Sequence, residues 1–124
     1  MFQTDGAYSG FAVDDLDAAR TFYAETLGLD VTTLASGFLE LNLESGGTVL
    51  IYGKEHHDPA GFTVLNFAVD DVEAAVDQLN ERGVQTAIYD DVPTDSKGIM
   101  RETDGPMIAW FRDPAGNVLA VHER

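Results

Sequence analysis

The sequence predicts an α+β fold made of two tandem βαβββ modules, because the chain contains an internal duplication. Residues 11–19 return almost unchanged as residues 67–75, at an offset of 56 (67 − 11). Within each copy the hydrophobic period changes from two residues, typical of a strand, to that of a helix. A second match, between residues 47–50 and 116–119, follows at an offset of 69 (116 − 47). A repeat on this scale sets the architecture, so we expect two copies of one module.

A strand is predicted at the start of each module, over residues 9–13 and 65–69, where large apolar residues alternate. Successive side chains of a strand point to opposite faces of its sheet. Phe11 and Val13 therefore share a face, which we expect to pack against a helix. The same holds in the second module for their counterparts, Phe67 and Val69.

An amphipathic helix follows each strand, over residues 16–26 and 72–82, with apolar residues at helical spacing. A pair of aspartates precedes each helix, and one of them is expected to cap the free N–H groups of the first turn. Gly28 and Gly83 mark the two C-terminal ends, because glycine readily adopts the left-handed conformation of a helix C-cap.

Three further strands complete each module. In the first module we expect them at 31–34, 38–43 and 48–52, and in the second at 84–89, 107–112 and 118–122. Turns are expected at 44–47 and 113–117. The stretch 90–105 is polar, contains glycine and proline, and has no counterpart of its length in the first module. It is predicted to be a mobile loop and a candidate lid.

We expect residues 1–124 to form a single domain, with modules at 1–53 and 62–124 joined by residues 54–61. A chain of 124 residues can bury roughly two-thirds of its unfolded surface, enough for one core. No apolar run reaches about 18 residues, so no membrane partner is expected. The N-terminus has no signal-peptide pattern, which favours a cytoplasmic location. The absence of cysteine excludes disulfides, thiolate metal sites and cysteine catalysis.

The charge is strongly negative, with 22 acidic against 7 basic residues and a net charge of −15. Nucleic acid is not an expected partner, because phosphate binding requires clustered Lys and Arg. One interpretation is attraction to a cationic ligand. The other is solubility in a salt-rich or acid-biased setting, which we favour because the acids lie mostly on the predicted helices and turns.

The sequence resembles the vicinal oxygen chelate superfamily, which includes glyoxalases, bleomycin-resistance proteins and extradiol dioxygenases. The resemblance rests on the paired modules, on residues 11–16, on Phe22-Tyr23 and 27–29 at the first helix end, and on 111–118. It covers nearly the whole chain. It implies that the two modules form a curved, partly open mixed-sheet cup around a pocket, and that the protein pairs as a homodimer.

The resemblance also implies where metal ligands would lie in metal-using members. The first-strand position falls on Tyr8, with Val64 as its partner at offset 56. The last-strand position falls on Ala120, with Ile51 as its partner at offset 69. One phenol and three hydrocarbons cannot hold a divalent cation. We therefore expect no metal in the cup and no other cofactor.

Strand alternation supplies candidate ligand-binding residues on the inner face of this cup. Tyr8 and Asn66 are favoured because an inward hydroxyl or amide needs a hydrogen-bonding partner. One of Trp110 and Phe111 should face the pocket, although the sequence does not decide which. His122 points to the same side as Ala120, but so close to the terminus that no role is the favoured interpretation. The candidates are Tyr8, Glu40, Asn66, Trp110, Phe111 and His122.

Two classes of function remain open. The first is a metal-independent binder of a small molecule such as a drug or metabolite, with a cationic ligand as one option. The second is a metal-dependent lyase, isomerase or dioxygenase of the same superfamily, with a non-standard ligand set drawn from His56, His57, His122, Glu40 or Glu123. The adjacent pair His56-His57 lies in the joining segment, where exposure to solvent is the favoured interpretation. The missing ligand set favours the binder, and no catalytic residue is assigned.

Overall fold

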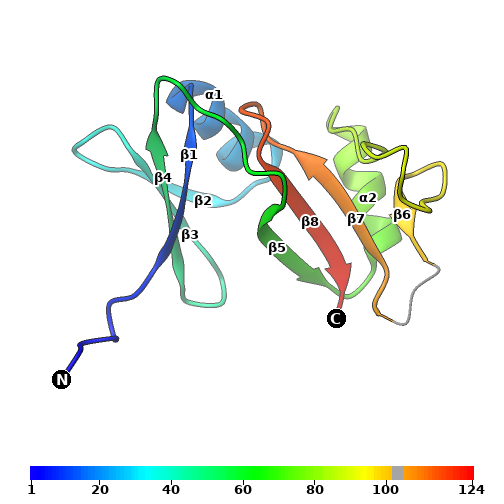
Figure 1. The fold of residues 1–124 in the computed structure, drawn as a ribbon, viewed down its shortest axis with the longest axis horizontal. Helices are drawn as coiled ribbons and strands as arrows, with labels where there is room; N and C mark the ends of the chain where they lie inside the picture. Colours follow the sequence, from blue (N-terminus) through cyan, green and yellow to red (C-terminus); the bar gives the residue numbers. More distant parts are fainter. Residues whose placement is uncertain (102–104) are drawn as a thin grey trace. The chain divides into compact units, whose positions relative to one another are not determined.

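The computed structural model describes residues 1–101 and 105–124 (Figure 1). The chain divides into two compact units, Met1–Asp58 and Pro59–Arg124. The boundary between them falls inside the predicted joining segment, 54–61. Each unit holds a four-stranded mixed sheet and a helical segment, so the predicted α+β class is confirmed.

The first unit has the strand order β1-β4-β3-β2. The parallel pair is β1 with β4, and the other neighbours are antiparallel. Its helical segment joins β1 to β2 along the chain. The elements are β1 (Ser9–Val13), α1 (Leu16–Arg20), the π-helix η1 (Thr21–Thr26), β2 (Asp30–Thr33), β3 (Leu39–Asn42) and β4 (Thr48–Gly53).

The helical segment begins and ends where the sequence predicts, but its second half is wider than an α-helix. The Asp15 carboxylate caps it by accepting a hydrogen bond from the Ala18 N–H at 3.1 Å. After Arg20 the turns widen to the π form, and the Leu27 N–H donates to the Phe22 carbonyl at 2.9 Å. The segment then stops at Gly28, whose φ is +76°.

The core of the first unit lies between the helical segment and one face of its sheet. Tyr23 is fully buried, and its ring lies 6.1 Å from Phe11 and 5.1 Å from Phe22, centroid to centroid. On β1, Phe11 and Val13 are buried as predicted, and Ala12 between them is buried as well. The other strands supply buried side chains from alternate positions: Leu39, Leu41, Val49 and Ile51.

The second unit repeats this plan with the order β5-β8-β7-β6 (Figure 1). Here β5 runs parallel to β8, and β7 lies antiparallel to both β8 and β6. The Asp71 carboxylate caps the helix through the Ala74 N–H at 3.0 Å, and the predicted C-cap Gly83 has a φ of +82°. The elements are β5 (Thr63–Val69), α2 (Val72–Glu81), β6 (Ile99–Met100), β7 (Ile108–Arg112) and β8 (Val118–Glu123).

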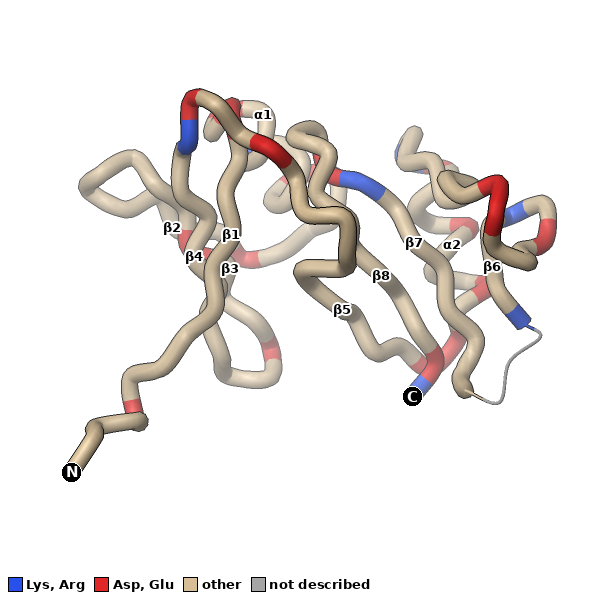
Figure 2. The backbone as a smooth tube through the Cα atoms, in the orientation of Figure 1, with Lys and Arg blue, Asp and Glu red and all other residues tan. Residues whose placement is uncertain are grey.

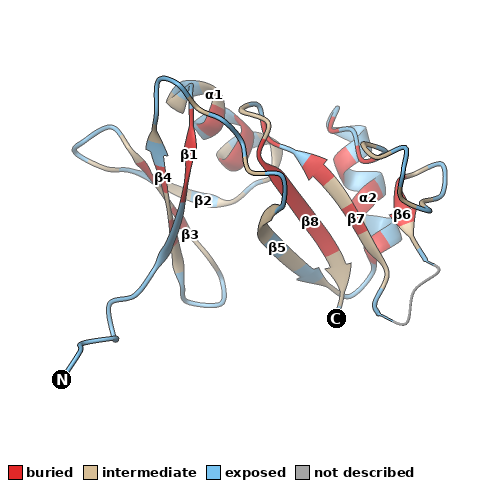
Figure 3. Ribbon diagram, in the orientation of Figure 1, coloured by how far each residue is buried: buried red, intermediate tan, exposed pale blue. Residues whose placement is uncertain are grey.

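Buried side chains in this unit gather along β8 and β7 and on one side of α2 (Figure 3). The Phe111 ring stacks on Phe67, with centroids 6.5 Å apart and planes 24° from parallel. On α2, the buried side chains have helical spacing: Val72, Val76 and Leu79. Burying three such side chains contributes several kcal/mol at about 1.5–3 kcal/mol each.

The prediction of a strand at 84–89 is wrong, since the fourth strand of this sheet is β6. The Thr86 hydroxyl donates to the Lys97 carbonyl at 2.6 Å, which directs this stretch along residues 97–99. A Cβ at Gly98 would overlap the Thr86 carbonyl, so only glycine permits this close approach. Within its described part, the predicted loop 90–105 therefore contains a strand and is attached to the unit.

The register of the last strands corrects the predicted offset. Leu41 pairs with Val49, and Phe111 pairs with Leu119, so the two hairpins correspond at an offset of 70 (111 − 41). The sequence match aligned Gly116 with Gly47. The turns instead align Gly116 with Gly46, because both have positive φ, +88° and +100°. The first-unit counterpart of Ala120 is consequently Leu50 and not Ile51.

Candidate functional site

Three of the six predicted site residues lie on one face of the second unit's sheet. Asn66 on β5 and Trp110 on β7 both pair with Ala120 on β8. His122 pairs with Ala68 on β5 and Ile108 on β7, two positions further along the same face. We call this surface, opposite the one that packs on α2, the helix-free face of the second unit.

Adjacent residues on β7 point to opposite faces, which separates Trp110 from Phe111. Phe111 is only 1% exposed and stacks on Phe67 in the core. It is therefore a core residue, and its place among the predicted ligand-binding residues is not supported. Trp110 is half-buried on the helix-free face. Ala120 beside it carries only a methyl group and is buried.

Tyr89 is a site residue that the sequence did not single out. Its ring meets the Trp110 indole edge to face, with centroids 5.4 Å apart and planes at 72°. Aromatic pairs of this geometry are favourable beyond the area that they bury. The two rings form an aromatic corner at the helix-free face. Tyr89 belongs to the predicted strand 84–89, which does not form, so strand alternation could not place it.

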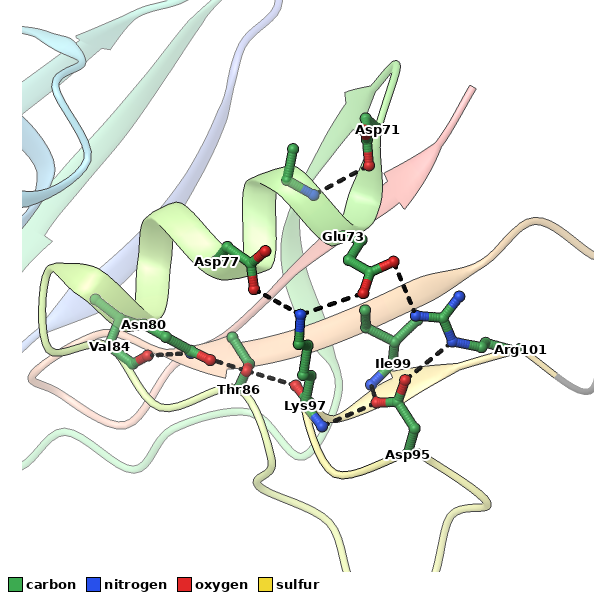
Figure 4. Close-up of polar contacts among 11 residues, drawn as sticks. Asp71, Glu73, Asp77, Asn80, Val84, Thr86, Asp95, Lys97, Ile99 and Arg101 are labelled. Carbon is green, nitrogen blue, oxygen red and sulfur yellow. Dashed lines mark hydrogen bonds and ion pairs between the residues drawn. The ribbon is translucent and has the colours of Figure 1, made fainter.

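The segment that carries Tyr89 is anchored on the other side of the sheet (Figure 4). Thr86 is 3% exposed, and its hydroxyl oxygen accepts a hydrogen bond from the Asn80 side-chain amide at 3.1 Å. The same amide donates to the Val84 carbonyl at 2.9 Å. These bonds fix the chain three residues before Tyr89. An open hollow of about 370 Å³ lies beside these hydrogen bonds. Its lining includes Asn80 and Thr86, whose side chains are hydrogen-bonded to each other.

Ion pairs hold the following residues against α2 (Figure 4). The Lys97 ammonium lies 2.9 Å from the Asp77 carboxylate and 3.2 Å from that of Glu73. The Arg101 guanidinium lies 2.9 Å from Asp95 and 3.5 Å from Glu73. We call these five side chains the α2 clamp. Its two cations, Lys97 and Arg101, are among only 7 basic residues in the chain, whereas the 22 acidic residues are spread over both units (Figure 2).

Within the clamp, the pKa values of Asp95, Lys97 and Arg101 are shifted in the directions that favour their charged forms. Burial raises the pKa of Asp95, but hydrogen bonds from the Ile99 N–H, the Arg101 side chain and the Lys97 N–H outweigh it and lower the pKa overall. Hydrogen bonds to Asp77 and Glu73 raise the pKa of Lys97. The Asp95 contribution is present above the ordinary carboxyl pKa and is lost as pH falls through its lowered value. The Lys97 contribution is present below the ordinary lysine pKa and is lost as pH rises through its raised value.

Replacing Lys97 with methionine is expected to loosen residues 95–99 while leaving the melting temperature almost unchanged. The ion pairs are exposed, and exposed pairs contribute little to global stability. The free energy of local opening at residues 95–99 should depend more strongly on these ion pairs, because they hold this segment against α2. Hydrogen exchange at neutral pH should show faster exchange at 95–99 than in the parent. Unchanged exchange there would contradict the clamp's role in positioning this segment.

The two predicted site residues of the first unit are placed differently. Glu40 is half-buried on β3, and its cross-strand partners are Leu50 and Thr32. It therefore lies on the face opposite the buried Leu39 and Leu41, as alternation predicts. Tyr8 directly precedes β1 and is 66% exposed. It is not held in a strand.

The residues at the family's ligand positions do not fit a metal ion. With the corrected register these positions are Tyr8, Leu50, Val64 and Ala120, and Val64 lies at an irregularity in the β5–β8 register. Three hydrocarbons and a phenol offer no ligand set for a divalent cation. Among residues 1–101 and 105–124, no three His, Asp or Glu side chains are arranged to hold a metal ion. We therefore derive no chemistry through a metal.

No helix of the described residues combines the length and apolar character needed to cross a bilayer.

Solved structures with this fold include two with resistance or binding descriptions. TnmS3, an antibiotic binding protein from Streptomyces sp. CB03234, is 25% identical, with a TM-score of 0.69 and 98% coverage of both chains. The fosfomycin resistance protein FosX from Listeria monocytogenes has a TM-score of 0.74 at 13% identity, covering 99% of this chain and 95% of its own. The latter likeness concerns the fold alone.

A relative in sequence is the uncharacterized protein YraH of Bacillus subtilis (strain 168), which is 26% identical over 125 residues, covering 90% of this chain and 91% of YraH. A family model matches residues 7–121, nearly the whole chain. The chain belongs to the Glyoxalase/Bleomycin resistance protein/Dioxygenase superfamily.

Proposed function

We propose that the protein binds a small molecule, such as a drug or metabolite, on the helix-free face of its second unit and without a metal ion. The observation that carries the proposal is the gathering of Asn66, Trp110 and His122 around Ala120. An aromatic surface with a few polar groups is the usual composition of a small-molecule site. Between these larger side chains lie two small ones, those of Ala68, which is exposed, and of Ala120, which is buried.

The aromatic and polar residues of this face would make different contacts with a ligand. The aromatic corner of Trp110 and Tyr89 offers a contact for a flat, apolar part of the ligand. The exposed Asn66 amide offers both a donor and an acceptor, which would orient the ligand. The net charge of −15 favours neutral or cationic ligands over anionic ones.

Binding without catalysis is favoured over the metal-enzyme alternative by the chemistry of the ligand positions. Three of the four ligand positions carry hydrocarbon side chains, so these positions cannot hold a metal ion that would polarise a substrate. The description of TnmS3 as an antibiotic binding protein also supports binding over metal-dependent catalysis. Elemental analysis of the purified protein tests the metal-free part, and one tightly held ion per chain would contradict it.

Replacing Asn66 with leucine is expected to weaken binding about 5- to 150-fold while leaving the fold intact. Loss of an orienting hydrogen-bond partner typically costs about 1–3 kcal/mol. Ligands identified by a melting-temperature screen would be titrated against the parent and N66L by calorimetry. The matched control is Gln78→Leu, the same loss of an amide on the exposed side of α2. Equal affinity in the parent and both variants would place the site elsewhere.

A further inference from the structure

We infer that His122 provides a fixed hydrogen-bond acceptor on the helix-free face, so that the site selects ligands carrying a hydroxyl or N–H donor. The inference rests on the proposed function of this face. It identifies the chemical class of the ligand, and it makes recognition depend on the protonation state of one imidazole.

The acceptor follows from the contact that His122 makes with the backbone. Its Nδ1 lies 3.2 Å from the carbonyl oxygen of Glu123. A carbonyl oxygen can only accept a hydrogen bond, so Nδ1 must carry the proton. In the neutral ring the second nitrogen, Nε2, is then unprotonated and acts as an acceptor. The backbone therefore selects the tautomer, in the way that a hydrogen bond to one ring nitrogen generally does.

Within the part of the chain that the structure describes, His122 has no charged cross-strand neighbour. Its cross-strand neighbours, Ala68 and Ile108, are uncharged. The Glu123 carboxylate points toward α2, where it accepts a hydrogen bond from the Val72 N–H at 3.4 Å.

Three other titratable side chains of residues 59–101 and 105–124 bear on this part of the sheet. Arg124, at the end of the chain, pairs with Asp70 at 3.0 Å. The Tyr89 phenol belongs to the aromatic corner, where its ring contacts Trp110. On β7, the charged residue Arg112 lies four positions from Ile108, beside Val118 at the other end of β8.

Protonation reverses the preference of the site. An imidazolium carries N–H groups at both ring nitrogens and has no acceptor left. A ligand that donates to Nε2 at high pH therefore loses this bond when the ring takes up a proton.

The test combines a spectroscopic measurement with a pair of matched aromatic probes. Nitrogen NMR of labelled protein at about pH 8 reports which ring nitrogen of His122 carries the proton. Phenol and anisole are then titrated while the indole N–H signal of Trp110 is followed. Phenol has a hydroxyl donor, whereas anisole has an ether oxygen in its place. His122→Gln keeps an acceptor without a titrating ring, and His122→Leu removes the acceptor.

We expect Nδ1 to be protonated and Nε2 bare, and phenol to bind about two- to tenfold more tightly than anisole at about pH 8. In the parent, this ratio should fall to about one under acidic conditions in which the NMR spectrum shows both ring nitrogens protonated. It should persist under the same conditions in H122Q and be absent in H122L.

Three outcomes would overturn the inference, and they are distinguishable. A proton on Nε2 in the free protein removes its basis directly. Equal binding of phenol and anisole at Trp110 rejects the acceptor role but leaves the proposed function standing. If neither probe changes the Trp110 signal at any concentration while His122 has the expected tautomer, the helix-free face is not a binding site, and the proposed function fails together with the inference.

Discussion

Replacing Phe111 with alanine is expected to lower the free energy of unfolding by about 3–5 kcal/mol, the usual cost of removing a buried phenylalanine ring. The ring is 1% exposed and stacks on Phe67 beneath α2, so its removal leaves a cavity that the sheet cannot easily fill. Chemical denaturation followed by circular dichroism provides the measurement.

The matched control is the neighbouring residue on the opposite face. Trp110→Ala should destabilise the protein less, because its side chain is half-buried and its described ring contact is with Tyr89 alone. Circular dichroism is preferred to fluorescence here, since this variant lacks the chain's single tryptophan. If W110A destabilises the protein as much as F111A, our assignment of the two faces of β7 is wrong.

Replacing Asp113 with alanine is expected to cost about 2–5 kcal/mol of unfolding free energy. The carboxylate is 5% exposed and accepts hydrogen bonds from the N–H groups of Ala115 at 3.0 Å and Asn117 at 2.8 Å. It also accepts one from the Asn117 side-chain amide at 3.0 Å. Alanine would remove the acceptor of these hydrogen bonds, of which the two from Asn117 are buried, and the loss of a buried partner costs about 1–3 kcal/mol.

Two variants make this prediction specific. Asp113→Asn keeps one carbonyl oxygen for the backbone donors, so it should lose less than D113A and remain measurable if D113A does not fold. Glu44→Ala removes an exposed acid from the corresponding turn of the first unit and should change stability little. A loss in E44A equal to that in D113A would show that general turn effects, and not buried hydrogen bonds, are responsible.

The fold was predictable from the sequence where local chemistry and periodicity agree. The strands and helices of the duplicated stretch are confirmed, including the capping residues Asp15 and Asp71 and both glycine C-caps. The wide turns of η1 were not predicted, because the apolar spacing of residues 16–26 also fits an α-helix.

The register and the segment after α2 depend on contacts that the sequence does not display. The offset between the hairpins is decided by which glycine adopts positive φ, Gly46 or Gly47, and either assignment fits the sequence. Residues 84–89 have the alternation of a strand, but the Thr86 hydroxyl bonds to the Lys97 carbonyl and β6 fills the place beside β7. A long-range contact of this kind overrides local propensity.

The candidate site was predictable to the extent that strands alternate. Asn66 and His122 were placed on the same side as Ala120 from the sequence, and the register confirms this arrangement. Alternation along β7 shows that Trp110 and Phe111 lie on opposite faces. It does not show which face each one occupies unless one residue of the strand is placed independently. Cross-strand pairing with Ala120 places Trp110 on the helix-free face.

The most direct test of the central claim, that small molecules bind at the helix-free face, uses Trp110, which is the only tryptophan of the chain. A panel of neutral and cationic aromatic compounds would be screened for a rise in melting temperature, and each hit titrated while Trp110 fluorescence is recorded. Our account predicts a saturable change in Trp110 emission, with the same dissociation constant as calorimetry and a weaker one in N66L. Compounds that stabilise the protein and bind by calorimetry without altering Trp110 emission would contradict it.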